Sequence, residues 1–177
     1  MIRPFRSEVV RYDWKDQRDY SKAGEFVYDH PFQWGSKRIG PDLHRIGGKY
    51  PHSWHFSHMA DPESTSKGSL MPGYTNLYEN EINWSFAPKS IKALRKVGVP
   101  YKPGYEEECI DDMKAQAEII FAELKKTNSK VEVRGTLYEP NADKEIIALI
   151  AYLQRMGTDI KKVAALPKDT KEEKKND

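Results

Sequence analysis

The stretch between residues 30 and 74 restricts the possible folds most, because its glycines and prolines leave room only for short helices. Gly40, Pro41 and the pair Gly47-Gly48 interrupt its first half and exclude a long helix there. The same stretch contains all five histidines and two of the four tryptophans of the chain. We therefore expect a domain of short helices and long loops organised around a segment rich in histidine and aromatic residues.

Length and composition favour one polar domain and exclude several classes of partner. The 177 residues suffice for one hydrophobic core, and 32% of them are charged. The formal net charge of +2 is too small to predict binding to nucleic acid or to an anionic membrane surface. No apolar run reaches the roughly 18 residues that a membrane-spanning helix needs, and the first residues do not resemble a signal peptide. Cys109 is the one cysteine, which excludes an internal disulfide.

Two segments in the second half of the chain carry apolar residues at helical spacing. Residues 105–126 have one apolar stripe, bordered by Cys109 as a buried free thiol, with acidic residues at the start and lysines at the end. Residues 142–156 have a second stripe, and Asn141 precedes them as a capping residue. The stripes consist of Ile110, Met113, Ala117, Ile120, Phe121 and Leu124 in the first, and Ile146, Leu149, Ile150 and Leu153 in the second.

Shorter elements and a tail complete the expected organisation. A short helix is predicted near residues 90–97, closed by Gly98, and extended structure at residues 131–133. Residues 158–177 end in the sequence KDTKEEKKND, so we expect them to form a charged, disordered tail.

Pro51 indicates the start of a short helix over residues 51–60. His52, His55 and His58 recur at every third position of it, so they spread over about 120° of its surface. One interpretation is a small metal-binding protein that uses these histidines, although no carboxylate or cysteine completes a tetrahedral set. In the other interpretation the histidines bond to backbone or water, while three neighbours pack in the core, namely Trp54, Phe56 and Met59.

Four motifs follow one another through this region: Gly-Pro-Asp-Leu at 40–43, Gly-Gly-x-Tyr at 47–50, Trp-His-x-x-His at 54–58 and Ser-x-Met-Pro-x-Tyr at 69–74. In this order they resemble the haem domain of the mono-haem subunit (subunit II) of cbb-type cytochrome c oxidases, which are the C-family haem-copper oxidases. Segments at 3–12, 21–38, 94–101 and 147–157 are similar to the same family. The resemblance extends over residues 2–157, and several motifs in one order are far more specific than any one of them.

The resemblance implies an all-α, cytochrome c-like domain over residues 1–157, truncated at its N-terminus, with haem c as its cofactor. A c-type cytochrome holds its haem through C-x-x-C-H, whose cysteines form thioethers and whose histidine binds the iron. This chain does not contain the motif, so covalent attachment is not possible in the chain as written. We therefore expect the helix that carries the motif in the family to be missing, and residues 142–156 to bury less of their apolar face without it.

The resemblance also assigns roles to individual residues. Met71 corresponds to the axial ligand of the haem iron, and a thioether is a soft, neutral ligand that raises the potential. Its loop, residues 61–74, has no apolar periodicity, so core packing does not explain a methionine there, whereas Met59, Met113 and Met156 fall on helical faces. Pro41 corresponds to the proline that packs on the haem ring. Trp34, Arg38 and Tyr74 correspond to neighbours of the haem pocket.

The function that the resemblance implies is electron transfer by haem c in aerobic respiration, toward the catalytic haem-copper subunit. The implied partners are this catalytic subunit and the di-haem subunit, at the periplasmic face of the bacterial inner membrane. Membrane association would come only through these partners or through a missing anchor. The alternative is a haem-free interaction module, or a fragment, that retains the docking surface of the family.

Overall fold

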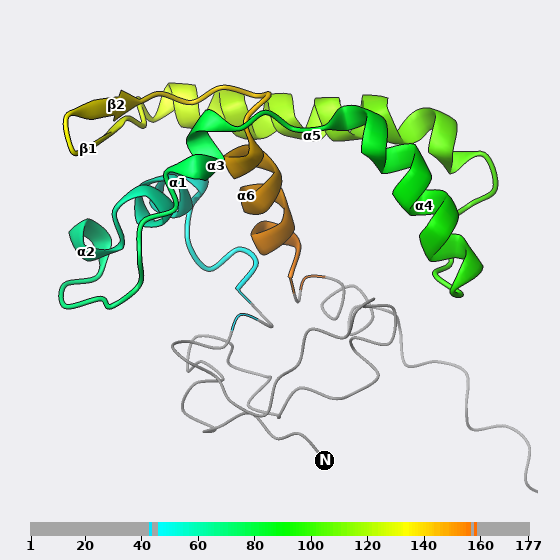
Figure 1. Ribbon diagram of the computed structural model, residues 1–177, viewed down its shortest axis with the longest axis horizontal. Helices are drawn as coiled ribbons and strands as arrows, with labels where there is room; N and C mark the ends of the chain where they lie inside the picture. The colour runs from blue at the N-terminus through cyan, green and yellow to red at the C-terminus, as the bar shows by residue number, and fades with distance from the viewer. Residues whose placement is uncertain (1–42, 44–45, 157, 159–177) are drawn as a thin grey trace, which may run out of the picture.

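The computed structural model describes residues 43, 46–156 and 158, and this part of the chain is mostly helical (Figure 1). The elements follow in the order α1 (His52–Ala60), α2 (Pro62–Thr65), α3 (Asn76–Glu79), η3 (Trp84–Phe86), α4 (Ala87–Lys96), α5 (Tyr105–Lys126), β1 (Val131–Val133), β2 (Thr136–Tyr138) and α6 (Glu145–Arg155). Within the described residues the strands form one antiparallel hairpin, in which Val131 pairs with Tyr138. The all-α class expected for a cytochrome c-like domain is confirmed.

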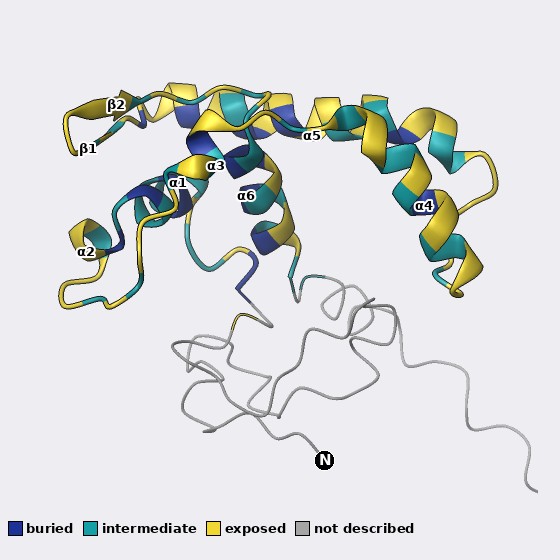
Figure 2. Ribbon diagram, in the orientation of Figure 1, coloured by how far each residue is buried: buried dark blue, intermediate teal, exposed yellow. Residues whose placement is uncertain are grey.

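The hydrophobic core lies where α1, α6 and the C-terminal half of α5 meet (Figure 2). Its largest fully buried apolar side chains come from these three helices and are Phe56, Leu124, Ile146, Ile147 and Ile150. Tyr78 of α3 closes one side, with its ring 5.0 Å from that of Phe56 in an edge-to-face arrangement and its hydroxyl donating to the Phe56 carbonyl. The core therefore fixes α1, the helix with three histidines, against the two longest helices.

The observed bounds of α5 are those that the apolar stripe predicts, from residue 105 to residue 126. Three stripe residues, Ala117, Ile120 and Leu124, are buried. The three glutamates of the first turn and the two lysines of the last turn complement the helix dipole. An apolar stripe at helical spacing between an acidic first turn and a basic last turn is therefore enough to predict the bounds of this helix.

The last helix begins three residues later than its apolar period predicts. Asn141 does not cap it, because its Oδ1 accepts from the N–H of Asp143 at 3.0 Å in the preceding turn. The first N–H of α6, on Glu145, instead donates to the Asn80 carbonyl at 3.2 Å. A helix start needs acceptors for its free N–H groups, and here a distant segment after α3 supplies one.

The expectation of reduced burial on α6 is wrong. Its apolar face contacts α1, α3 and α5, and Ile146, Ile150 and Leu153 are each 4% exposed or less. Only Leu149 of the predicted stripe is half-buried rather than buried. The long helix α5 and the short helices α1 and α3 thus bury the apolar face that we expected to be less covered.

Helices α4 and α5 form a hairpin that extends away from the core (Figure 1). Arg95 and Glu106 join the helices through an ion pair with 2.5 Å between Nη2 and Oε2, and Arg95 also donates to the Lys102 carbonyl at 2.8 Å. Cys109 is buried as a free thiol, as predicted. Helix α4 starts earlier than predicted, because Pro88 near its N-terminus suits the first turn.

Candidate functional site

A column of stacked rings runs along one face of α1. Tyr50 stacks on Trp54 with ring centroids 3.9 Å apart, and Trp54 stacks on His58 at 4.3 Å. The Nζ of Lys49 lies 4.4 Å from the centre of the Tyr50 ring at the end of the column. Trp54 and His58 lie four positions apart on α1, so their side chains lie above one another, and Tyr50 extends the column from the segment just before the helix.

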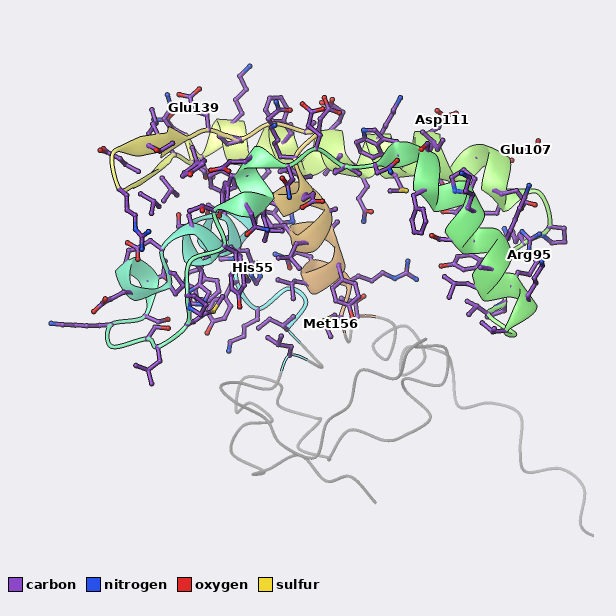
Figure 3. The ribbon with its side chains drawn as sticks, in the orientation of Figure 1. His55, Arg95, Glu107, Asp111, Glu139 and Met156 are labelled. Atoms are coloured by element: carbon purple, nitrogen blue, oxygen red, sulfur yellow. The ribbon has the colours of Figure 1, made fainter. Side chains whose placement is uncertain are left out.

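The side chains of the three histidines of α1 point in different directions. The Nδ1 of His52 lies 2.8 Å from Oε2 of Glu123 on α5, and the Nδ1 of His58 lies 2.5 Å from Oγ1 of Thr65 on α2. His55 turns into the interior instead (Figure 3). No group of three or more His, Cys, Asp and Glu residues in the described part of the chain is placed to hold a metal ion. The histidine metal site that the spacing left open is therefore not formed.

His55 is 1% exposed, and neither of its ring nitrogens has a hydrogen-bond partner among the residues that the structure describes. Its ring meets Trp54 edge-on at 5.3 Å and Tyr50 edge-on at 6.0 Å. The expectation that the histidines of this helix bond to backbone or water is wrong for His52 and His58, which bond to side chains. The expected burial of Phe56 is confirmed. A buried polar group without a partner costs free energy, so the His55 imidazole needs an explanation.

Burial, with added repulsion from His52, His58 and Lys49, lowers the pKa of His55 from 6.5 to about 4. Burial also lowers the pKa of His58. Because a charged imidazole is disfavoured in this surrounding, His55 is neutral at physiological pH. One ring nitrogen then carries a hydrogen and the other a free lone pair.

Acid is expected to destabilise the fold through His55. Between pH 6.5 and pH 4 the unfolded chain takes up a proton at this residue and the folded chain does not, so stability is complete above pH 6.5 and falls as the pH falls through this window. We expect a loss on the order of 2 kcal/mol. Urea unfolding at pH 7 and pH 4.5 measures it.

The matched variants isolate this residue from the carboxylates that also titrate. His55→Phe keeps a buried ring without a titrating group, so its loss of stability between the two pH values should be smaller by that amount. His52→Gln leaves the His55 imidazole buried, and because burial is the main cause of its lowered pKa, this variant should keep most of the pH dependence. An identical pH dependence in His55→Phe and the unchanged chain would contradict the assignment.

The loop that carries Met71 returns to the C-terminal end of α1. Tyr74 N–H donates to the Met59 carbonyl at 2.7 Å. Gly73 lies so close to α1 that an added Cβ would be 2.3 Å from the Ala60 carbonyl oxygen. Met71 is half-buried, and its N–H donates to Oγ of Ser69 at 3.2 Å. The fold thus ties the Met71 loop to the helix that carries His55.

The first part of this loop differs from the prediction. Residues 62–65 form the single turn α2 rather than irregular structure. Pro62 at the first position and Glu63 after it suit a helix start, and Ser64 Oγ donates back to the Asp61 carbonyl at 2.7 Å. The turn brings Thr65 to His58, which restrains the loop at a second point.

Gly73→Ala is expected to lower the free energy of unfolding by about 1–3 kcal/mol, because the new methyl group would overlap the Ala60 carbonyl and force the loop away from α1. Thermal or urea unfolding measures the change. Leu70→Ala is the control in the same loop, since Leu70 is fully exposed and its loss should change stability by less than about 0.5 kcal/mol. Equal losses in the two variants would show that the close contact does not restrain the loop.

Of the other residues that the motifs assign to a haem pocket, the structure describes only Tyr74. Tyr74 ends the Met71 loop and is 40% exposed. Trp34, Arg38 and Pro41 lie outside the described residues. Lys49, Thr65 and Glu123 contact the histidines or their neighbours, and the sequence analysis did not identify them. The stacked column could have been predicted only from the four-residue spacing of Tyr50, Trp54 and His58.

The described residues fit a haem in two respects. The half-buried thioether of Met71 lies in a loop that holds no apolar stripe and is anchored to α1 at its end. The buried ring nitrogens of His55 on the same helix lack partners among the described residues, and a bound group could provide one. A neutral imidazole and a thioether are both groups that proteins place around haem.

Comparison with known proteins identifies a family. A family model described as "Cytochrome C oxidase, mono-heme subunit/FixO" matches residues 1–160. No curated protein matches the chain. No helix of the described part is both long and apolar enough to cross a lipid bilayer. The matched residues include α1, the Met71 loop and the core helices α5 and α6, so the resemblance drawn from the motifs is confirmed.

Proposed function

The chain belongs to the family of mono-haem subunits of cytochrome c oxidase, FixO, and from this premise we propose that it relays electrons through haem c to the catalytic haem-copper subunit of a cbb-type oxidase. The observation that supports the proposal best is the family match over residues 1–160, which contains a methionine loop fixed to a buried helix. The described residues offer no cluster with metal-ligand geometry that would favour another cofactor.

We assign Met71 as the axial ligand of the haem iron in this site. When bound, the haem supplies a one-electron redox centre, and a thioether ligand favours its ferrous state. The chain would hold the sulfur in place through the ends of its loop, where Tyr74 N–H bonds to the Met59 carbonyl and Thr65 bonds to His58. The core beneath α1 would keep this helix rigid. The Met71 side chain would then stay in one position and would not have to be rearranged at each electron transfer.

The partners and the location follow from the family as proposals. We assign the catalytic subunit as electron acceptor and the di-haem subunit as neighbour, at the periplasmic face of the bacterial inner membrane. Pro41, Trp34 and Arg38 would complete the haem surroundings as packing and propionate-binding residues. Such a site needs no acid, base or nucleophile, because electron transfer between haems makes and breaks no covalent bond.

Co-purification tests the proposal. An affinity tag after residue 177 should capture the catalytic subunit from membranes of cells that produce the whole oxidase, and pyridine haemochrome analysis should find haem in the tagged subunit after the complex is separated. Capture without haem in this subunit would favour the haem-free interaction module. Failure to capture any oxidase subunit would contradict both functions.

A further inference from the structure

The imidazole of His55 is a buried polar group whose nitrogens form no hydrogen bond with the described residues. It is buried beside the aromatic rings of Tyr50 and Trp54. The other two histidines of α1 are bound to Glu123 and Thr65. Replacing His55 by an apolar residue would remove an unpaired buried group, so stability alone does not explain a histidine at this position.

The charges around His55 favour an anion. Burial is the main cause that lowers the pKa of His55, and positive charge on His52, His58 or Lys49 adds to it. Lys49 is the cation among these three at pH 7, and its Nζ lies over the Tyr50 ring. This positive charge attracts a negative group brought into the site. Glu123 is the carboxylate bonded to His52. The groups around His55 that carry positive charge or can acquire it are His52 and His58 on α1 and Lys49 before this helix.

A neutral imidazole in such a place has one N–H to donate. A carboxylate is the acceptor that matches both this donor and the surrounding charge, and a hydrogen bond to a charged acceptor is about twice as strong as one between neutral groups. Haem carries two propionate carboxylates on one edge, and the proposed haem ligand Met71 lies in the loop tied to this same helix.

We propose that His55 binds a propionate carboxylate of the haem through its ring N–H. The inference rests on the proposed function, because it needs haem in this chain. It places the propionate edge of the haem toward α1 and makes His55 a positioning residue rather than a ligand of the iron. It also gives the stacked column a purpose, since Tyr50 and Trp54 hold the imidazole in one orientation.

Haem and its dimethyl ester, in which both carboxylates are blocked, separate propionate binding from all other contacts. We would titrate each ferric porphyrin into the full chain at pH 7 and follow the Soret absorption. The unchanged chain should bind haem about 10- to 100-fold more tightly than the ester, as expected from one hydrogen bond to a charged group. In His55→Phe the affinity for haem should fall to that for the ester, while the affinity for the ester stays the same.

Two further variants control the interpretation. His55→Gln keeps an N–H donor at this position and should retain part of the preference for haem. His52→Gln, whose histidine is bonded to Glu123, leaves the His55 donor in place and should retain more of the preference than His55→Phe does. Circular dichroism of each variant establishes that it folds, and the comparison of the two porphyrins in the unchanged chain needs no variant at all.

Several results would overturn the inference. These are equal affinity of the unchanged chain for the two porphyrins, a preference for haem that survives in His55→Phe, or no binding of either porphyrin. A change in the spin state of both bound porphyrins in His55→Phe would assign the imidazole to the iron instead. None of these results affects capture of the oxidase by the tagged subunit, so a failure here and a failure of the proposed function can be told apart.

Discussion

Replacing Met71 by alanine is expected to convert the haem of this protein from six-coordinate low-spin to high-spin or water-ligated. The test uses a form extended before Met1 by a C-x-x-C-H segment, whose histidine would bind the iron from the other side. Met71→His should stay low-spin, because imidazole is also a strong ligand. Its midpoint potential should move negative by on the order of 0.2 V, since imidazole donates more strongly than a thioether.

Met59→Ala is the matched control for Met71. Met59 packs against the core from α1, so its loss should lower stability and leave the haem spectrum unchanged. The observable is the near-infrared charge-transfer band of methionine-ligated ferric haem. Survival of this band in Met71→Ala together with its disappearance in Met59→Ala would exchange the roles that we assign to the two methionines.

Ile120→Ala is expected to cost about 2–5 kcal/mol of stability, which is enough to unfold much of a marginally stable domain. Ile120 is 3% exposed in the core between α5 and α6, so the variant leaves a cavity that these helices cannot close. Urea unfolding followed by circular dichroism measures the change.

The neighbouring residue supplies the control. Ile119 lies on the same helix and is 67% exposed, so Ile119→Ala removes the same atoms from solvent rather than from the core and should change stability by less than about 0.5 kcal/mol. Similar losses in the two variants would mean that α5 packs on the core through a different face.

The elements that the sequence predicts best are those that depend on their own residues. The bounds of α5 follow from one apolar stripe between acidic and basic ends, and α1 follows from Pro51 and the aromatic residues after it. The start of α6 was predicted too early, because the acceptor for its first N–H is the Asn80 carbonyl, 65 residues earlier in the chain. Local patterns carry no information on such a distant partner.

The candidate site also has features that the local sequence predicts and features that depend on distant packing. The chemistry of Met71 can be predicted from a methionine in a loop of serine, glycine and proline, but its attachment to α1 depends on the close approach of Gly73 to Ala60. The burial of His55 could not be predicted from helical spacing, because His52, His55 and His58 are chemically identical and only the packing of α2 and α5 distinguishes them. Because the three side chains point in different directions, they form no shared metal site among the described residues.

Electron flow through the assembled oxidase tests the central claim most directly. The purified complex that contains this subunit would be mixed rapidly with a reduced donor, and the haem of this subunit and the catalytic haem would be followed at separate wavelengths. We predict that the haem of this subunit is reduced first and the catalytic haem after it, and that Met71→His slows the first of these steps by lowering the potential. Reduction of the catalytic haem at an unchanged rate in a complex whose mono-haem subunit carries no haem would contradict the account.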